Sequence, residues 1–163
     1  MDALERRKIL IENMKNLKTL GIDCQSCPGH CCTFERNSMQ VTQLEAEDVL
    51  SYLKEKQLWN EELKNKIKQC IKDFRLDQYL PSNGKKSFLR RTYTCPFFEG
   101  KNEGCSLPND IKPYGCLGYN AQEKNEVAGL SCRSDQKILE EREKFVVSFG
   151  EKKSLPMALM ELE

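Results

Sequence analysis

The sequence has no long apolar run and no excess of charge of one sign. Its uninterrupted apolar stretches, such as residues 9–11 and 145–147, are far shorter than the roughly 20 residues that a membrane-spanning helix needs. Lys and Arg number 26 and Asp and Glu number 25, so the formal net charge is +1. This balance offers no broad basic surface for a polyanion. We therefore expect a soluble protein that binds neither a membrane nor nucleic acid.

The sequence also lacks the marks of export and of a nucleotide-binding enzyme. Its N-terminal residues have mixed charge and are not followed by the apolar segment of a secretory signal. No glycine-rich phosphate-binding loop stands after a strand-like segment. The 163 residues fit a single domain, residues 1–163, and leave little room for a separate cofactor domain. We expect a cytoplasmic protein whose cysteines stay reduced.

Apolar spacing and capping residues predict a mostly α fold, with helices around an irregular cysteine-rich core and at most a short β-hairpin. Thr42 and Glu45 form a capping box, and Asn60 is placed to cap the next helix. Gly21 stands where a left-handed C-cap would end the first helix. The expected helices cover residues 2–20, about 43–57, 60–74, about 135–149 and about 155–162.

The middle of the chain is predicted to be less regular. Pro81 to Gly84 has turn chemistry, and Phe88 to Tyr93 is the best strand candidate. From Cys95 to Ser131 the sequence is broken repeatedly by proline and glycine, so no long regular element is expected there. Metal ligation would account for the order of this segment, because metal binding supplies folding free energy that the local backbone cannot.

Eight of the nine cysteines are candidate metal ligands. They are Cys24, Cys27, Cys31, Cys32, Cys95, Cys105, Cys116 and Cys132. The C-x2-C spacing of the first two forms a tight turn that brings both sulfurs to one ion, at about 2.3 Å for zinc. Adjacent side chains diverge, so we expect one of Cys31 and Cys32 to serve a different or a bridged centre. The ninth, Cys70, falls on an apolar helical stripe and is expected in the core.

Thiolates are soft ligands, so this set favours zinc or iron–sulfur over magnesium or calcium. Eight thiols permit two four-sulfur sites, or one iron–sulfur cluster with a structural ion. The adjacent cysteines and the surplus of thiols favour a polynuclear iron–sulfur centre over zinc. His30 lies in the first ligand loop, where the surrounding sulfurs already suffice, so we expect a loop residue near the metal. Aromatic residues close to the cysteines are expected to pack around the site.

At these residues the chain resembles the cysteine-cluster family named for its CxxCxxCC motif, a zinc- or iron-chelating domain also found in flagellin N-methylases. The resemblance covers residues 20–140. The matching features are Cys24, Cys27, Cys31 and Cys32, the Thr42-capped helix, Cys95-Pro96-Phe97, Cys105, Lys112 to Cys116, and Cys132. Three residues separate Cys27 from the cysteine pair where the family has two, and Lys112 replaces the usual Arg.

Three functions follow as expectations. The first is a protein that holds an iron–sulfur cluster or zinc through clustered thiolates. The second, a structural zinc module, would present a helical face to a protein partner. The third is implied by the resemblance alone: support for methyl transfer to a protein lysine, as in flagellin N-methylases. The sequence does not identify a catalytic residue.

Overall fold

The computed structural model describes residues 3–21, 30–35, 37–78, 80–82, 85–87, 91–101, 103–125, 129–134 and 152–163. The protein is mostly α, as the sequence predicts. Within these ranges the helical elements are α1 (Ala3–Thr19), the 3-10 turn η1 (His30–Cys32), α2 (Gln43–Glu55), α3 (Glu61–Phe74), α4 (Tyr114–Gly118) and α6 (Leu155–Glu161). None of the described helices is both long and apolar enough to cross a membrane.

The β structure in the described ranges consists of four separate two-stranded antiparallel pairs, more than the single short hairpin that was expected. The pairs are β1 (Gln40–Val41) with β8 (Lys153–Ser154), β2 (Leu80–Ser82) with β3 (Lys85–Ser87), β4 (Phe98–Gly100) with β5 (Gly104–Cys105), and β6 (Tyr119–Asn125) with β7 (Gly129–Ser134). Only the β1–β8 pair joins segments distant in the sequence.

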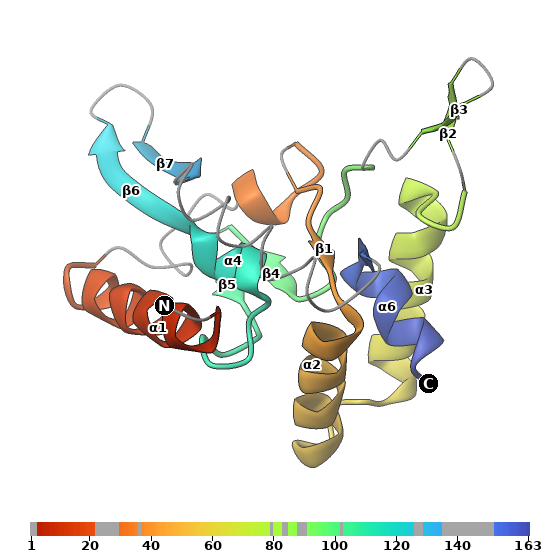
Figure 1. The fold of residues 1–163 in the computed structure, drawn as a ribbon, viewed down its shortest axis with the longest axis horizontal. Helices are drawn as coiled ribbons and strands as arrows, with labels where there is room; N and C mark the ends of the chain where they lie inside the picture. Colours follow the sequence, from red (N-terminus) through yellow and green to blue (C-terminus); the bar gives the residue numbers. More distant parts are fainter. Residues whose placement is uncertain are drawn as a thin grey trace.

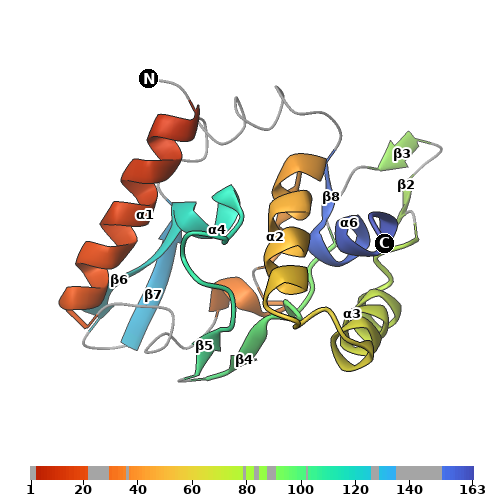
Figure 2. The same cartoon turned by 90° about the horizontal axis from the view of Figure 1, so that it is seen from below.

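The described elements form two groups, which meet where α4, η1 and the hairpin of β4 and β5 lie (Figure 1). In one group α1 contacts α4, and α4 contacts β6. In the other group α6 contacts both α2 and α3. Figure 2 shows the same separation from below, with β4 and β5 between the two groups. The candidate ligands described below come from elements at this junction.

Helix α1 forms where apolar spacing predicts it. Leu10 and Met14 lie one turn apart and are both buried, which gives the helix its inner face. The helix ends at Thr19, and Gly21 adopts a φ of +75°, the left-handed conformation that favours glycine. The N–H of Gly21 donates to the carbonyl of Lys18 at 3.0 Å, so the predicted C-cap is confirmed.

Helix α2 begins with the predicted capping box. The backbone N–H of Glu45 donates to Thr42 Oγ1 at 3.3 Å, and the N–H of Thr42 donates to Glu45 Oε2 at 3.0 Å. Both side chains are buried. The two bonds satisfy donors that the helix itself leaves without partners.

Thr42→Ala is therefore expected to lower the free energy of unfolding by about 1 to 2 kcal/mol, because it leaves the buried N–H of Glu45 without an acceptor. Urea denaturation of the two proteins measures this difference. Thr42→Ser is the matched control, since it keeps the hydroxyl acceptor, and it should lose clearly less stability. Equal losses in both variants would mean that packing of the methyl group, not capping, determines the effect.

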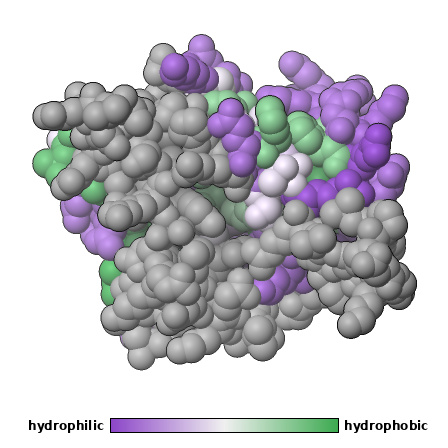
Figure 3. Space-filling model, turned by 90° about the horizontal axis from the view of Figure 1, so that it is seen from above, coloured by the Kyte–Doolittle hydropathy of each residue, from purple (hydrophilic) through white to green (hydrophobic). Residues whose placement is uncertain are grey.

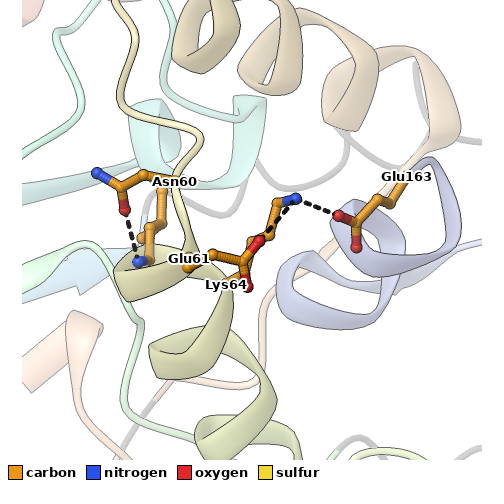
Figure 4. Close-up of polar contacts among 5 residues, drawn as sticks. Asn60, Glu61, Lys64 and Glu163 are labelled. Atoms are coloured by element: carbon orange, nitrogen blue, oxygen red, sulfur yellow. Dashed lines mark hydrogen bonds and ion pairs between the residues drawn. The ribbon is translucent and has the colours of Figure 1, made fainter.

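Helix α3 also begins at its predicted cap and is tied to α6. Asn60 Oδ1 accepts a hydrogen bond from the N–H of Leu63 at 2.9 Å (Figure 4). Lys64 pairs with Glu61 at 3.5 Å and also with Glu163, which follows α6 (Figure 4). This pair of contacts connects the first turn of α3 to the end of the chain.

The hydrophobic core lies where α2, α3 and α6 meet. Its buried members are Val41, Ala46, Val49, Leu50, Leu53, Ile67, Cys95, Phe97, Leu107, Leu155, Ala158 and Leu159. The presence of Cys95 and Phe97 in this set means that the cysteine-bearing segment is anchored by core packing. On the face shown in Figure 3, hydrophilic residues border the apolar ones.

Three expectations for the rest of the chain have different outcomes. Residues 91–93 of the predicted strand 88–93 are in no strand, because Tyr93 enters the core and its N–H bonds to an irregular segment; residues 88–90 lie outside the described residues. Between Cys95 and Ser131 the described elements are short, as expected, and the longest is β6, with 7 residues, which pairs with β7. The predicted helix 135–149 falls outside the described residues.

Candidate metal centre

Two segments far apart in the sequence run antiparallel and bring together cysteines from both halves of the chain. The N–H of Cys95 donates to the carbonyl of Cys32 at 2.7 Å. Further along, the N–H of Tyr93 donates to the carbonyl of Asn37 at 2.9 Å. The backbone therefore holds the segment that carries Cys95 against the segment that carries Cys31 and Cys32.

A turn followed by a hairpin positions Cys105 beside this contact. The N–H of Phe98 donates to the carbonyl of Cys95 at 3.0 Å, with Pro96 at the second position of the turn, where its fixed φ fits. Phe98 in β4 then lies opposite Cys105 in β5. Gly104 has a φ of +76°, which closes the hairpin in a conformation that other residues rarely adopt.

Helix α4 positions Cys116. The N–H of Cys116 donates to the carbonyl of Pro113 at 2.9 Å at the start of the helix. Because α4 contacts β1, Cys116 lies near the segment that leads into this strand. Its Sγ donates to the thioether Sδ of Met39 at 3.2 Å.

For the remaining predicted site residues, the structure gives the backbone position or no description. Cys132 is in β7, opposite Ala121 in β6, and β7 contacts η1, which carries Cys31 and Cys32. The strand that bears Cys132 thus lies beside the adjacent cysteine pair. Cys24 and Cys27 fall outside the described residues. His30 forms the first residue of η1.

The electrostatics of Cys32 show that several thiols lie near it. A hydrogen bond with Cys31 lowers the pKa of Cys32, but burial and three neighbouring thiols outweigh this effect, so the pKa is raised. The neighbours are Cys95, Cys116 and Cys105. A thiolate at Cys32 would be repelled by thiolates at these positions, and a cation among them would reverse that repulsion.

Burial holds two further cysteines in the thiol form. Burial and the neighbouring Cys105 raise the pKa of Cys95 to about 12. Burial and Asp73 raise the pKa of Cys70 to about 11. Cys70 is buried on α3, as predicted, and its Sγ donates to the carbonyl of Thr94 at 3.4 Å. This residue of the core therefore lies next to the segment that carries a candidate ligand.

The fit of a metal to this arrangement rests on the donor chemistry. Six cysteines among the described residues form no disulfide, and the side chains of four of them affect the pKa of Cys32. No group of three or more Cys, His, Asp or Glu in the described part of the chain is already arranged to hold an ion. The donor type therefore fits a soft metal, and binding requires the thiols to close around it and to lose protons.

Sequence patterns missed one residue that contacts a candidate ligand, Met39. The thioether of Met39 contacts a candidate ligand, and Tyr93 O–H donates to the carbonyl of Met39 at 2.7 Å. Lys112 is buried and its Nζ donates to Asn109 Oδ1 at 3.0 Å. Local spacing carries no signal for the first contact, because Met39 and its partner Cys116 are 77 residues apart.

No protein-family model, curated protein or solved structure matches this chain. Membership of the cysteine-cluster family is therefore a hypothesis that depends on the cysteine motifs themselves. A functional assignment has to come from the chemistry of the site.

Proposed function

We propose that this is a cytoplasmic metal-binding protein in which cysteine thiolates hold an iron–sulfur cluster or zinc, as a member of the CxxCxxCC cysteine-cluster family. The proposed ligands are Cys24, Cys27, Cys31, Cys32, Cys95, Cys105, Cys116 and Cys132. Their thiolates would supply soft, negatively charged donors, and the bound metal would supply positive charge that offsets their mutual repulsion.

The observation that carries the proposal is the backbone contact between Cys32 and Cys95. The N–H of Cys95 and the carbonyl of Cys32 are 2.7 Å apart, although 62 residues lie between the two positions in the sequence. Cys105 and Cys116 are also close enough to raise the pKa of Cys32. Four thiols gathered from three elements and the irregular segment that carries Cys95 are more than a packed core needs, since buried thiols behave there as small hydrophobic groups.

Among metals, the adjacent cysteines of η1 support an iron–sulfur centre. Cys31 and Cys32 are consecutive, and their side chains diverge from the backbone, so a centre with more than one metal atom suits them better than a single ion. A structural zinc site is the second candidate. The burial of Cys95 in the hydrophobic core favours it, because a ligand fixed by core packing couples metal binding directly to folding.

Purification without air, followed by elemental analysis and visible spectroscopy, tests the proposal and separates the two metals. An iron–sulfur centre should give a brown protein with iron and acid-labile sulfide and with charge-transfer absorption. A colourless protein with stoichiometric zinc would identify the structural zinc module. Protein that contains neither metal, and that binds neither after reconstitution with iron and sulfide or with zinc, would refute the proposed function.

A further inference from the structure

The contact between Cys116 and Met39 places a thioether inside the cluster of thiols. Cys116 Sγ donates to Met39 Sδ at 3.2 Å. Met39 is partly buried and packs against the hydrophobic core, and Cys116 is also partly buried. The two sulfur atoms thus contact each other at a place that is partly shielded from water. Thioether sulfur is a weak hydrogen-bond acceptor but a good ligand for soft metal ions.

The backbone of Met39 is held in place from two sides. The O–H of the buried Tyr93 donates to the carbonyl of Met39 at 2.7 Å, and the N–H of Leu155 donates to Tyr93 Oη at 3.4 Å. The N–H of Met39 in turn donates to Asn37 Oδ1 at 3.1 Å. These bonds satisfy the backbone polar groups of Met39 and fix the point from which its thioether side chain extends toward Cys116.

We propose that Met39 and Cys116 form a thioether–thiolate pair that binds a soft d10 metal ion, with copper(I) as the probe. The inference rests on the proposed function, because Cys116 is one of its ligands, and it adds a donor that the cysteines do not supply. On binding, the thiol of Cys116 releases its proton to solvent, and one lone pair of each sulfur forms a bond to the ion. No atom is oxidised or reduced in this step, since copper is supplied as copper(I).

The geometry needs only a small adjustment. Two sulfurs that each lie about 2.3 Å from one ion are separated by about 3.8 Å when the angle between the two bonds is tetrahedral. The observed separation of 3.2 Å, with a proton between the sulfurs, is shorter than this. Replacing the proton with a metal ion therefore requires the two side chains to move apart by about 0.6 Å, which rotation about the flexible side-chain bonds of methionine permits.

The test compares the full-length protein with Met39→Leu and Met160→Leu. Both methionines are partly buried against the same core, and leucine preserves their size without the sulfur, so Met160→Leu is the matched control. Each protein is titrated anaerobically with copper(I) against a competing chelator. We expect Met39→Leu to bind copper(I) at least about tenfold more weakly, and Met160→Leu to match the unsubstituted protein.

A direct readout separates ligation from a structural effect. Selenomethionine-labelled protein loaded with copper(I) should show a selenium–copper distance in X-ray absorption at the selenium edge, and labelled Met39→Leu should not. Equal copper(I) affinities in all three proteins, or labelled protein without a selenium–copper signal, would overturn the inference while leaving thiolate binding of zinc or iron intact. Failure of the unsubstituted protein to bind copper(I), zinc or iron would overturn both proposals together.

Discussion

Cys32→Ser is expected to weaken metal binding by at least about a hundredfold and to lower the melting temperature of the metal-loaded protein by about 5 to 11 °C. Loss of a residue that only supports a ligand typically weakens metal affinity about 10- to 100-fold, so loss of a thiolate that contacts the metal should exceed this. Cys32 is the central member of the described thiols, since the side chains of Cys95, Cys105 and Cys116 all affect its pKa.

The expected temperature shift follows from the linkage of binding to folding. A hundredfold loss of affinity removes about 2.7 kcal/mol of stabilisation when the metal is in excess. Each kcal/mol changes the melting temperature of a domain of this size by about 2 to 4 °C. The hydrogen bond from Cys95 to Cys32 joins backbone atoms, so serine retains it and the variant should still fold. Elemental analysis and calorimetry measure the two effects.

Cys70→Ala is the matched control for this experiment. Cys70 is buried, as Cys95 is, and it lies near Cys95 through its bond to the carbonyl of Thr94, yet it belongs to the apolar face of α3. Alanine should lower the free energy of unfolding by about 1 kcal/mol and leave the metal content unchanged. If Cys32→Ser retained full metal content and affinity, Cys32 would not be a ligand. Metal loss in Cys70→Ala would show that its assignment to the core is wrong.

The same experiment extends to the C-x2-C pair. Cys24→Ser and Cys27→Ser should each lower metal content and stability together, because the tight turn between these two cysteines is expected to bring both sulfurs to one ion. Each variant would be compared with Cys70→Ala as above. A metal-to-protein ratio that stayed the same in both would remove the C-x2-C turn from the ligand set.

The helices could be predicted because their signals are local. The left-handed Gly21, the Thr42–Glu45 capping box and the Asn60 cap each act within about one turn of helix, and all three are present in the structure. The apolar stripes that contain Leu10 and Ile67 are also buried as their spacing predicts. In such segments the neighbouring residues decide the conformation.

The elements that were missed depend on contacts between distant segments. Arg91 to Tyr93 has strand-like composition, yet Tyr93 is oriented by its bonds to Asn37 and Met39, which lie more than 50 residues earlier in the chain. Strands β1 and β8 are also far apart in the sequence, so local patterns could not predict that they pair. Strand β6 was missed for a different reason: its residues Tyr119 to Asn125 are mostly polar, and the glycines that flank the hairpin indicated loops.

In the candidate site, too, the sequence predicts the features that depend on local spacing and misses those that depend on distant contacts. The spacing of cysteines identified the donor type, but it could not specify which thiols become neighbours. The structure places Cys32 beside Cys95 through a backbone bond that no motif indicates. It also brings Met39 to Cys116, because α4 contacts the β1 strand that follows Met39. The tertiary structure therefore adds a sulfur donor, the thioether of Met39, that a count of cysteines omits.

Leu53→Ala is expected to lower the free energy of unfolding by about 2 to 5 kcal/mol, the range for a leucine truncated in a packed core. Leu53 is 2% exposed on the inner face of α2, in the core cluster that also contains Cys95. The carbonyl of Leu53 accepts bonds from the N–H groups of Leu58, at 2.8 Å, and Trp59, at 3.1 Å. Alanine preserves both bonds, so the loss reports side-chain packing.

Leu44→Ala on the same helix is the matched control, because Leu44 is 37% exposed. Its truncation should change the free energy of unfolding by no more than about 0.5 kcal/mol, since little apolar area returns to water and alanine favours the helix. Urea denaturation of both variants in the presence of metal measures the difference. Similar losses at the two positions would contradict the packing of α2 against α6. A large loss at Leu53 alone would confirm that α2 packs into the hydrophobic core that also contains Cys95.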